Sequence, residues 1–244
     1  MILTLAVVVG VLLGGVVASY ATTWALRATD DGAPSGPRSR CDGCQHPLTW
    51  SQTLPVVSYV VARGRCAHCA AAISPYHPIG EALGMVLGAM IALAAPDGRA
   101  LPLAVIAASL LAASVYDART WALPRATTGL AAGAAFALAA WHGRDSLIVG
   151  LIAAAATFAV TKTLAVLYQR RNGRVGFGDG DVLLLSALAI WLGAATPWMV
   201  LVACGLGLIF ALVGRRRRFP FGPMIALSGV SIGLLLEAGI WPRP

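Results

Sequence analysis

The stretch that decides the fold runs from residue 182 to residue 214, VLLLSALAIWLGAATPWMVLVACGLGLIFALVG, and contains no charged residue. A helix that crosses the hydrocarbon core of a bilayer needs about 20 apolar residues, so this run is too long for a single crossing. Gly193 to Pro197 lies near its middle and offers a break, because glycine and proline interrupt helices. The run therefore predicts two short transmembrane helices joined by a turn.

Apolar blocks of the same kind fill most of the remaining chain. Hydrophobic residues make up 58% of the sequence and charged residues only 11%, whereas soluble domains carry about 25% charged residues. The apolar residues do not form the short alternating segments of a membrane barrel, so helices are expected to satisfy the backbone in lipid. The sequence thus predicts an all-α polytopic membrane protein with about eight transmembrane helices, the other six at 1–26, 79–95, 100–116, 126–141, 146–168 and 223–241.

The basic residues indicate topology rather than a nucleic-acid partner. The net charge is +8, but the basic side chains lie mainly in loops beside the apolar blocks, so no nucleic acid is expected to bind. Cytoplasmic loops are enriched in Lys and Arg, and an outside N-terminus leaves only Arg99, Arg144 and Arg243 in outside loops. The first block is followed directly by Arg27, the opposite polarity to a secretory signal, so it is expected to be retained. Lys162 falls inside a block and is expected to snorkel to the cytoplasmic edge.

A polar segment, residues 27–78, separates the first block from a seven-helix core at 79–244. It holds two C-x-x-C pairs, which supply four thiols from Cys41, Cys44, Cys66 and Cys69. Four thiolates at such spacing suit a structural Zn²⁺ ion, and the cytoplasm disfavours disulfides. We therefore expect a small cytoplasmic zinc module, with a redox pair or unligated thiols as the alternatives.

Acidic residues stand at the ends of two predicted spans. Asp117 ends the third block and Asp179 precedes the sixth, so both are expected at the cytoplasmic face. Two neighbouring carboxylates can share a proton and act as acid and base on a peptide bond. Alternatively, Asp179 simply favours a helix N-terminus, and Asp117 pairs with Arg119 or Arg125. Asp181 competes with Asp179 for the second catalytic position, and spacing alone does not separate them.

Eight short segments, which follow one another along the chain, resemble a known family. Together they resemble the prepilin leader peptidases, membrane aspartyl proteases of type IV pilus and type II secretion systems. The segments are Arg40-Cys41-Asp42-Gly43-Cys44, Leu54-Pro55-Val56-Val57-Ser58-Tyr59, Arg63-Gly64-Arg65-Cys66-Ala67-His68-Cys69, Ile73-Ser74-Pro75, Pro78-Ile79-Gly80-Glu81, Asp117-Ala118-Arg119 with Leu123-Pro124, Gly176-Phe177-Gly178-Asp179 and Phe219-Pro220-Phe221-Gly222-Pro223.

The resemblance implies a reaction and roles for individual residues. Asp117 and Asp179 match the catalytic pair, which selects Asp179 over Asp181, and the four cysteines match the family's zinc module. The implied reaction is removal of a basic leader from prepilin or pseudopilin substrates, just after a Gly, at the cytoplasmic face of the inner membrane. Many relatives with the cysteine module also methylate the new N-terminus from S-adenosylmethionine, and Glu81 matches a position suited to amine or methyl-transfer contacts.

Two positions depart from the family's pattern. Asp181 stands where the family usually has Lys, and Arg125 stands where it usually has Asp or Asn. An exchange of charges, with Arg125 paired to Asp181, is one hypothesis. The departures also leave room for a second function, a catalytically inactive scaffold of a pilus or secretion assembly. A zinc-bearing transporter ranks last, because no acidic relay crosses the apolar blocks.

Overall fold

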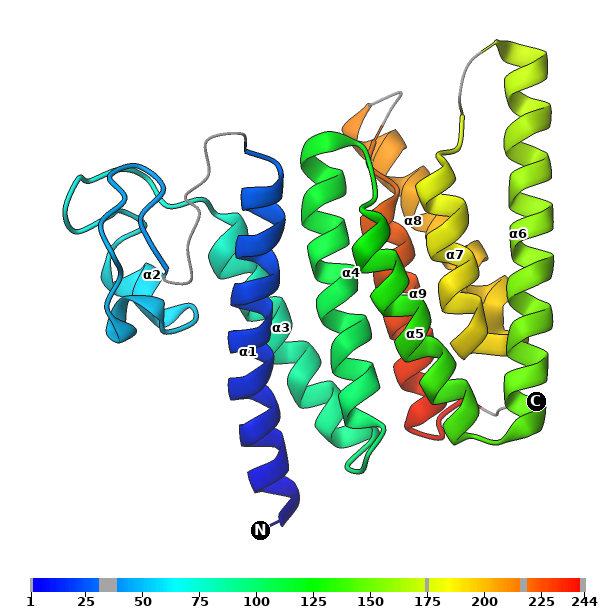
Figure 1. Cartoon of the computed structure of the whole chain (residues 1–244), viewed down its shortest axis with the longest axis horizontal. Coiled ribbons are helices and arrows are strands. Elements are labelled where there is room, and N and C mark those ends of the chain that lie inside the picture. Colours follow the sequence, from blue (N-terminus) through cyan, green and yellow to red (C-terminus); the bar gives the residue numbers. More distant parts are fainter. Residues whose placement is uncertain (1, 31–38, 174–175, 216–218, 242–244) are drawn as a thin grey trace.

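The computed structural model describes residues 2–30, 39–173, 176–215 and 219–241, and within these ranges it contains helices and turns but no β-strand (Figure 1). The all-α prediction is therefore confirmed. A short 3-10 turn, η1 (Trp50–Thr53), and the short helix α2 (Val57–Val61) lie in the cysteine-bearing segment. The long helices are α1 (Ile2–Ala28), α3 (Tyr76–Ala94), α4 (Ala100–Thr120), α5 (Arg125–Trp141), α6 (Arg144–Asn172), α7 (Asp179–Leu192), α8 (Thr196–Gly214) and α9 (Gly222–Glu237).

The long helices fall on the predicted apolar blocks. The predicted break in the 182–214 run is confirmed as a 3-10 turn, η2 (Gly193–Ala195), between α7 and α8. By length and apolar composition, five described stretches suffice to cross a membrane, namely α1, α3, α4, α6 and the bent stretch Asp179–Gly214. Helix α9 is apolar but shorter. The chain is thus a polytopic membrane protein, while the count of eight crossings is not confirmed.

The helices stand side by side, and their order brings distant segments to one end. In Figure 1 the C-terminal ends of α1, α4 and α6 lie at the upper end with the starts of α5 and α7. The buried core is formed mainly by α4, α7 and α9, with smaller contributions from α3, α5 and α8, and includes Ile106, Leu188, Trp191, Met199 and Ile225. The two predicted acidic positions, at the end of α4 and the start of α7, therefore share one end of the bundle, as expected.

Helices α1 and α3 approach each other through glycines. Gly10 and Gly14 on α1 face Gly84 and Gly88 on α3, and a Cβ at Gly88 would overlap the backbone of Gly10. Small residues four apart let membrane helices pack backbone to backbone, where van der Waals contact replaces the missing hydrophobic drive. This contact fixes α1 against the helix that follows the cysteine segment.

Replacing Gly88 by Ala is expected to lower the apparent Tm in detergent, because overpacking costs about 1–3 kcal/mol. The matched control is Gly133→Ala on α5, where a Cβ meets nothing within 4 Å. That change should stabilise slightly, by about 0.4–1 kcal/mol. Equal Tm shifts in the two variants would show that the α1–α3 contact is not tightly packed.

Candidate functional site

Asp117 lies near the C-terminal end of α4 and is buried, with 4% of its surface exposed. Its carboxylate Oδ2 accepts a hydrogen bond of 2.8 Å from the backbone N–H of Gly222, the first residue of α9. A Cβ at Gly222 would stand 2.8 Å from the same oxygen, so only glycine lets the backbone come this close. Burial of a carboxylate inside a membrane bundle is costly, and one hydrogen bond offsets only part of that cost, so Asp117 is a candidate functional residue.

The first turn of α7 presents two carboxylates in different surroundings. The Asp179 side chain is 77% exposed, and its Oδ1 forms an ion pair of 2.6 Å with Lys162 Nζ on α6. Asp181 is half-buried, and its Oδ2 accepts the N–H of Gly178 at 3.3 Å, which caps the helix. The Asp181 carboxylate also interacts electrostatically with Asp117. Of the two acids, Asp181 is the less exposed, and it lies close enough to Asp117 for their charges to interact.

Leu123 in the α4–α5 loop joins the three segments that make the site. A Cβ at Gly180 would stand 2.9 Å from the Leu123 Cβ, and one at Gly222 would stand 2.9 Å from its Cδ2. On the α9 side, the rings of Phe177 and Phe221 meet edge to face with centroids 5.8 Å apart. The end of α4, the start of α7 and the start of α9 thus converge on one apolar-walled acidic site.

Other predicted contacts come out differently. Arg119 pairs with Asp30 at 2.6 Å rather than with Asp117. Among the ion pairs of the described residues, none joins Arg125 to Asp181, so the structure does not bring the hypothesised charge exchange together. Lys162 reaches Asp179 at the end of the bundle, and its position at the cytoplasmic edge remains a prediction.

The sequence itself contains a signal that favours Asp181. The G-x-G-D pattern occurs in two overlapping registers, Gly176 to Asp179 and Gly178 to Asp181. In the second register the acid is followed directly by the apolar run of α7. The spacing between the two acids, about 200° around a helix, also predicts that they point to opposite sides.

The four predicted zinc ligands come together in space. The Sγ atoms of Cys41, Cys44, Cys66 and Cys69 all lie within 4.8 Å of one another. Tetrahedral zinc with Zn–S distances of about 2.3 Å separates sulfurs by about 3.8 Å, and the Cys41 and Cys69 sulfurs lie 3.8 Å apart. The cluster therefore fits a metal ion, and the identity of that ion as zinc remains a prediction.

The two C-x-x-C pairs adopt the same backbone turn. Gln45 N–H donates to Cys41 O at 2.9 Å, and Ala70 N–H donates to Cys66 O at the same distance. Gln45 and Ala70 both have a left-handed backbone, with φ of 59° and 57°. A turn of this kind points successive backbone N–H groups toward the sulfur of the first cysteine in the pair. The backbone N–H groups of Cys69 and His68 accordingly lower the pKa of the Cys66 thiol to about 6, which favours the thiolate that binds metal.

Glu81 lies in the second turn of α3. It is buried, and its carboxylate accepts hydrogen bonds from Ser19 Oγ on α1 at 2.6 Å and from the N–H of Val56 at 2.7 Å. Val56 has φ of 62°, a costly conformation for a β-branched residue. A cavity of about 190 Å³ between α1, the cysteine segment and α3 is lined by Glu81, His77 and Arg27. The Arg27 Nε is buried without a hydrogen-bond partner among the described residues.

Comparisons with known proteins match both halves of the chain. Residues 12–95 match the bacterial peptidase A24 N-terminal domain, and residues 104–212 match the type IV leader peptidase family. A prepilin leader peptidase/N-methyltransferase of Burkholderia pseudomallei is 37% identical over 216 residues, which cover 83% of this chain and 70% of the relative. The chain belongs to the type IV leader peptidase family. No solved structure matches it.

Further relatives of the family carry similar names. The type 4 prepilin-like proteins leader peptide-processing enzyme of Escherichia coli is 32% identical over 80% of this chain and 74% of the relative. A prepilin leader peptidase/N-methyltransferase of Neisseria gonorrhoeae is 34% identical over 79% of this chain and 69% of its own length. The first domain match contains the cysteine cluster and Glu81, and the second contains Asp117 and both acids of α7.

Proposed function

We propose that this protein is a membrane aspartyl endopeptidase that removes the leader of prepilin-like proteins, with Asp117 as one member of its catalytic pair. One observation carries the proposal. The buried Asp117, held by Gly222 N–H at 2.8 Å, shares one end of the bundle with the acidic first turn of α7, and Leu123 packs against Gly180 and Gly222 between them. Membership in the type IV leader peptidase family supports the choice of substrate.

Asp181 is the second catalytic acid in this proposal, although the resemblance alone selects Asp179. Two acids in a dyad must share a proton, which requires that each lie near the other and away from cations. Asp181 interacts with Asp117, whereas Asp179 is exposed and neutralised by Lys162 at 2.6 Å. Asp179 stays a prediction from the resemblance, and the Asn series described in the Discussion separates the two.

The dyad acts on the peptide carbonyl in two proton transfers. The ionised acid takes a proton from water, which attacks the carbonyl carbon, while the protonated acid donates its proton to the carbonyl oxygen. Collapse of the tetrahedral intermediate breaks the C–N bond, and the leaving amine takes up a proton from the dyad. The N–H of Gly222 stabilises the ionised form of Asp117. The pair titrates as a unit, so neither acid has a fixed role.

The orientation proposed from charge places this site and the cysteine cluster in the cytoplasm, in an inner-membrane protein with its N-terminus outside. In the sequence, most basic residues belong to the cysteine-bearing segment or lie at and just after the ends of α4, α6 and α8, which favours the cytoplasm for the end of the bundle where α4 and α6 end. A leader that stays in the cytoplasm would meet the dyad where the substrate's apolar helix leaves the bilayer.

Purified protein in nanodiscs, mixed with a prepilin, tests the peptidase. Wild type is expected to release the leader, as followed by mass spectrometry of the pilin N-terminus, and Asp117→Asn is expected to release none within the same time. If wild type cleaves none of several prepilins and pseudopilins, the result would favour the inactive scaffold. Cleavage by Asp117→Asn at the wild-type rate would remove Asp117 from the dyad.

We further propose that the Glu81 cavity serves N-methylation of the new N-terminus. S-adenosylmethionine, when bound, supplies a methyl group on a sulfonium centre and carries a carboxylate. Arg27, whose Nε has no partner, suits that carboxylate, and the anionic Glu81 suits a cationic amine or sulfonium. Both residues line the same cavity of about 190 Å³.

Glu81→Gln is expected to lower methylation about tenfold or more, because a hydrogen bond to a charged group is worth about 1.5–3 kcal/mol. Leader cleavage should continue, since Glu81 lies on α3 and outside the dyad. The mass of the mature pilin N-terminus reports both steps in one sample. Asp145→Asn, an exposed acid in the first turn of α6, is the matched control. Equal loss of both steps would mean that Glu81 only maintains the fold.

A further inference from the structure

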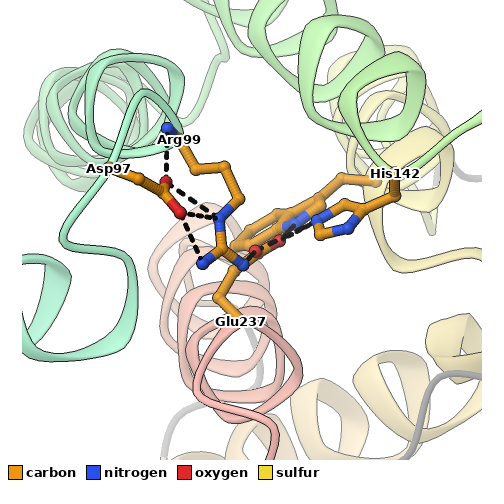
Figure 2. A network of polar contacts seen from close by, with 5 residues as sticks. Asp97, Arg99, His142 and Glu237 are labelled. Atoms are coloured by element: carbon orange, nitrogen blue, oxygen red, sulfur yellow. Dashed lines mark hydrogen bonds and ion pairs between the residues drawn. The ribbon is translucent and has the colours of Figure 1, made fainter.

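Glu237, the last residue of α9, is a buried acid at the end of the bundle opposite the dyad. Its side chain has no exposed surface, and it accepts hydrogen bonds from Arg99 Nη1 at 2.8 Å and from Trp191 Nε1 at 2.9 Å. His142 Nε2 lies 3.1 Å from its carboxylate. Asp97 holds the Arg99 guanidinium from the other side, with Nε 3.0 Å from each carboxylate oxygen (Figure 2).

Two of the three named partners of Glu237 belong to the helices that carry the acids, and the third, His142, is the C-cap of α5. Arg99 is the N-cap of α4, whose last turn holds Asp117. Trp191 stands in the last turn of α7, whose first turn holds Asp179 and Asp181. Glu237 therefore ties together the far ends of the two helices whose near ends form the dyad.

Helix α9 connects the dyad end of the bundle to the Glu237 end directly. Gly222 begins the helix and donates its N–H to Asp117, while Glu237 ends it and accepts from α4 and α7. A helix of 16 residues is a stiff rod of about 24 Å. A shift of α9 along its axis would therefore change both ends together.

The Trp191 ring is held against α9 by a glycine. A Cβ at Gly233 would overlap the Trp191 indole ring, so only glycine lets the ring lie on the helix one turn before Glu237. This contact aims the indole N–H at the buried carboxylate. The packing and the hydrogen bond thus fix the same register between α7 and α9.

A buried carboxylate in a membrane protein is expensive and persists when it is paired. A purely structural anchor would satisfy that condition with any neighbouring helices. Here, besides His142 after α5, the partners come from the far ends of α4 and α7, and the first residue of α9 donates its N–H to Asp117. These partners are explained if the contacts of Glu237 set the positions of the acids at the opposite ends of α4 and α7.

We propose that Glu237 is a positioning residue, which fixes the axial register of α4 and α7 against α9 and thereby the separation of the acids in the dyad. The inference rests on the proposed peptidase function for its kinetic consequence, while its structural consequence at Gly222 is independent of any activity.

Glu237→Gln keeps the shape and removes the charge. The expected result is a 10- to 100-fold fall in kcat for leader removal with KM within a few-fold of wild type, because small displacements of reacting groups cost about 10²-fold in rate. The pH profile of kcat should shift, because a weaker Gly222 N–H bond changes the titration of Asp117. Hydrogen exchange of the Gly222 amide, resolved by fragment mass spectrometry, should be faster.

Ser228→Ala is the matched control. Ser228 is fully buried on the same helix, but its hydroxyl donates to Ile225 O within α9. This variant should keep the wild-type pH profile and the wild-type exchange at Gly222, even if its Tm falls. If Glu237→Gln does not fold, Trp191→Phe removes the indole donor together with the ring that packs on Gly233, and it is expected to produce the same changes in smaller measure.

Two results would overturn the proposal. One is a Glu237→Gln variant, or a Trp191→Phe variant in its place, with a lower Tm but wild-type kcat, pH profile and Gly222 exchange, as expected of a simple anchor. The other is Gly222 exchange that changes equally in Ser228→Ala. If wild type cleaves no prepilin, the peptidase proposal fails separately, and the exchange measurement alone still decides the role of Glu237.

Discussion

Conversion of Asp181 to Asn is expected to lower kcat for leader removal by about 10²- to 10⁴-fold, the usual contribution of general acid–base catalysis. Asp117→Asn should show a loss of the same size. Asp179→Asn is expected to change kcat by no more than a few-fold, because an exposed ion pair is worth about 1 kcal/mol or less. The three variants share one chemistry, since each replaces a carboxylate by an amide of equal size.

The difference between Asp179 and Asp181 follows from their surroundings. The Asp179 side chain is 77% exposed and forms an ion pair with Lys162, a cation that a dyad acid would not have beside it. Asp181 is half-buried and lies close enough to Asp117 for their charges to interact, which is the arrangement that the proposed dyad requires. A shared proton is what the reaction needs, and the double variant Asp117→Asn with Asp181→Asn should lose little beyond either single change.

Initial rates measured with one prepilin in nanodiscs, with Tm as the check on folding, decide between the two acids. The informative control is Lys162→Gln, which frees Asp179 from its ion pair and should leave kcat close to wild type. A large loss in Asp179→Asn together with an active Asp181→Asn would put Asp179 in the dyad, as the resemblance predicts, and would require the first turn of α7 to rotate when substrate binds.

The membrane helices could be predicted because their signal is local. Each apolar block stands on its own in the sequence, and the break at Gly193 was marked by residues that interrupt helices. The cysteine cluster was equally readable, because the spacing within each pair fixes the turn that presents the sulfurs. The number of crossings was harder, since α5 and α9 are short and the stretch from α7 to α8 is bent rather than divided by polar residues.

The contacts of the site could not be read in the same way. Whether Asp179 or Asp181 faces Asp117 depends on how α7 is rotated against α4, which is set by packing around Leu123 and Gly180. The hypothesis of an Arg125–Asp181 ion pair is not supported for a similar reason. Opposite charges at two positions of a sequence do not imply that the two side chains are in contact. A simpler rule would have found Glu237, since an acid inside an apolar block is a functional candidate by default.

Loss of the metal is expected to unfold the cysteine segment. None of the described residues from 39 to 79 is buried, so this segment has no hydrophobic core of its own. Structural zinc binds with an apparent free energy of about 10–16 kcal/mol in small modules, and that energy is folding energy. Replacing Cys44 by Ser removes one of four ligands and should therefore leave the segment largely unfolded. Zinc content per chain should fall from about one to near zero.

Metal analysis and limited proteolysis measure this prediction together. Trypsin is expected to cut wild type slowly at Arg63 and Arg65, and quickly after chelation or in Cys44→Ser. Cys204→Ser is the matched control, because that thiol is exposed on α8, away from the cluster, and should change neither zinc content nor cutting. A Cys44→Ser protein that keeps a full equivalent of zinc and resists trypsin would show that the four sulfurs do not hold the ion. Slow cutting of a zinc-free wild type would instead mean that packing against α1 and α3, rather than a metal, keeps the segment folded.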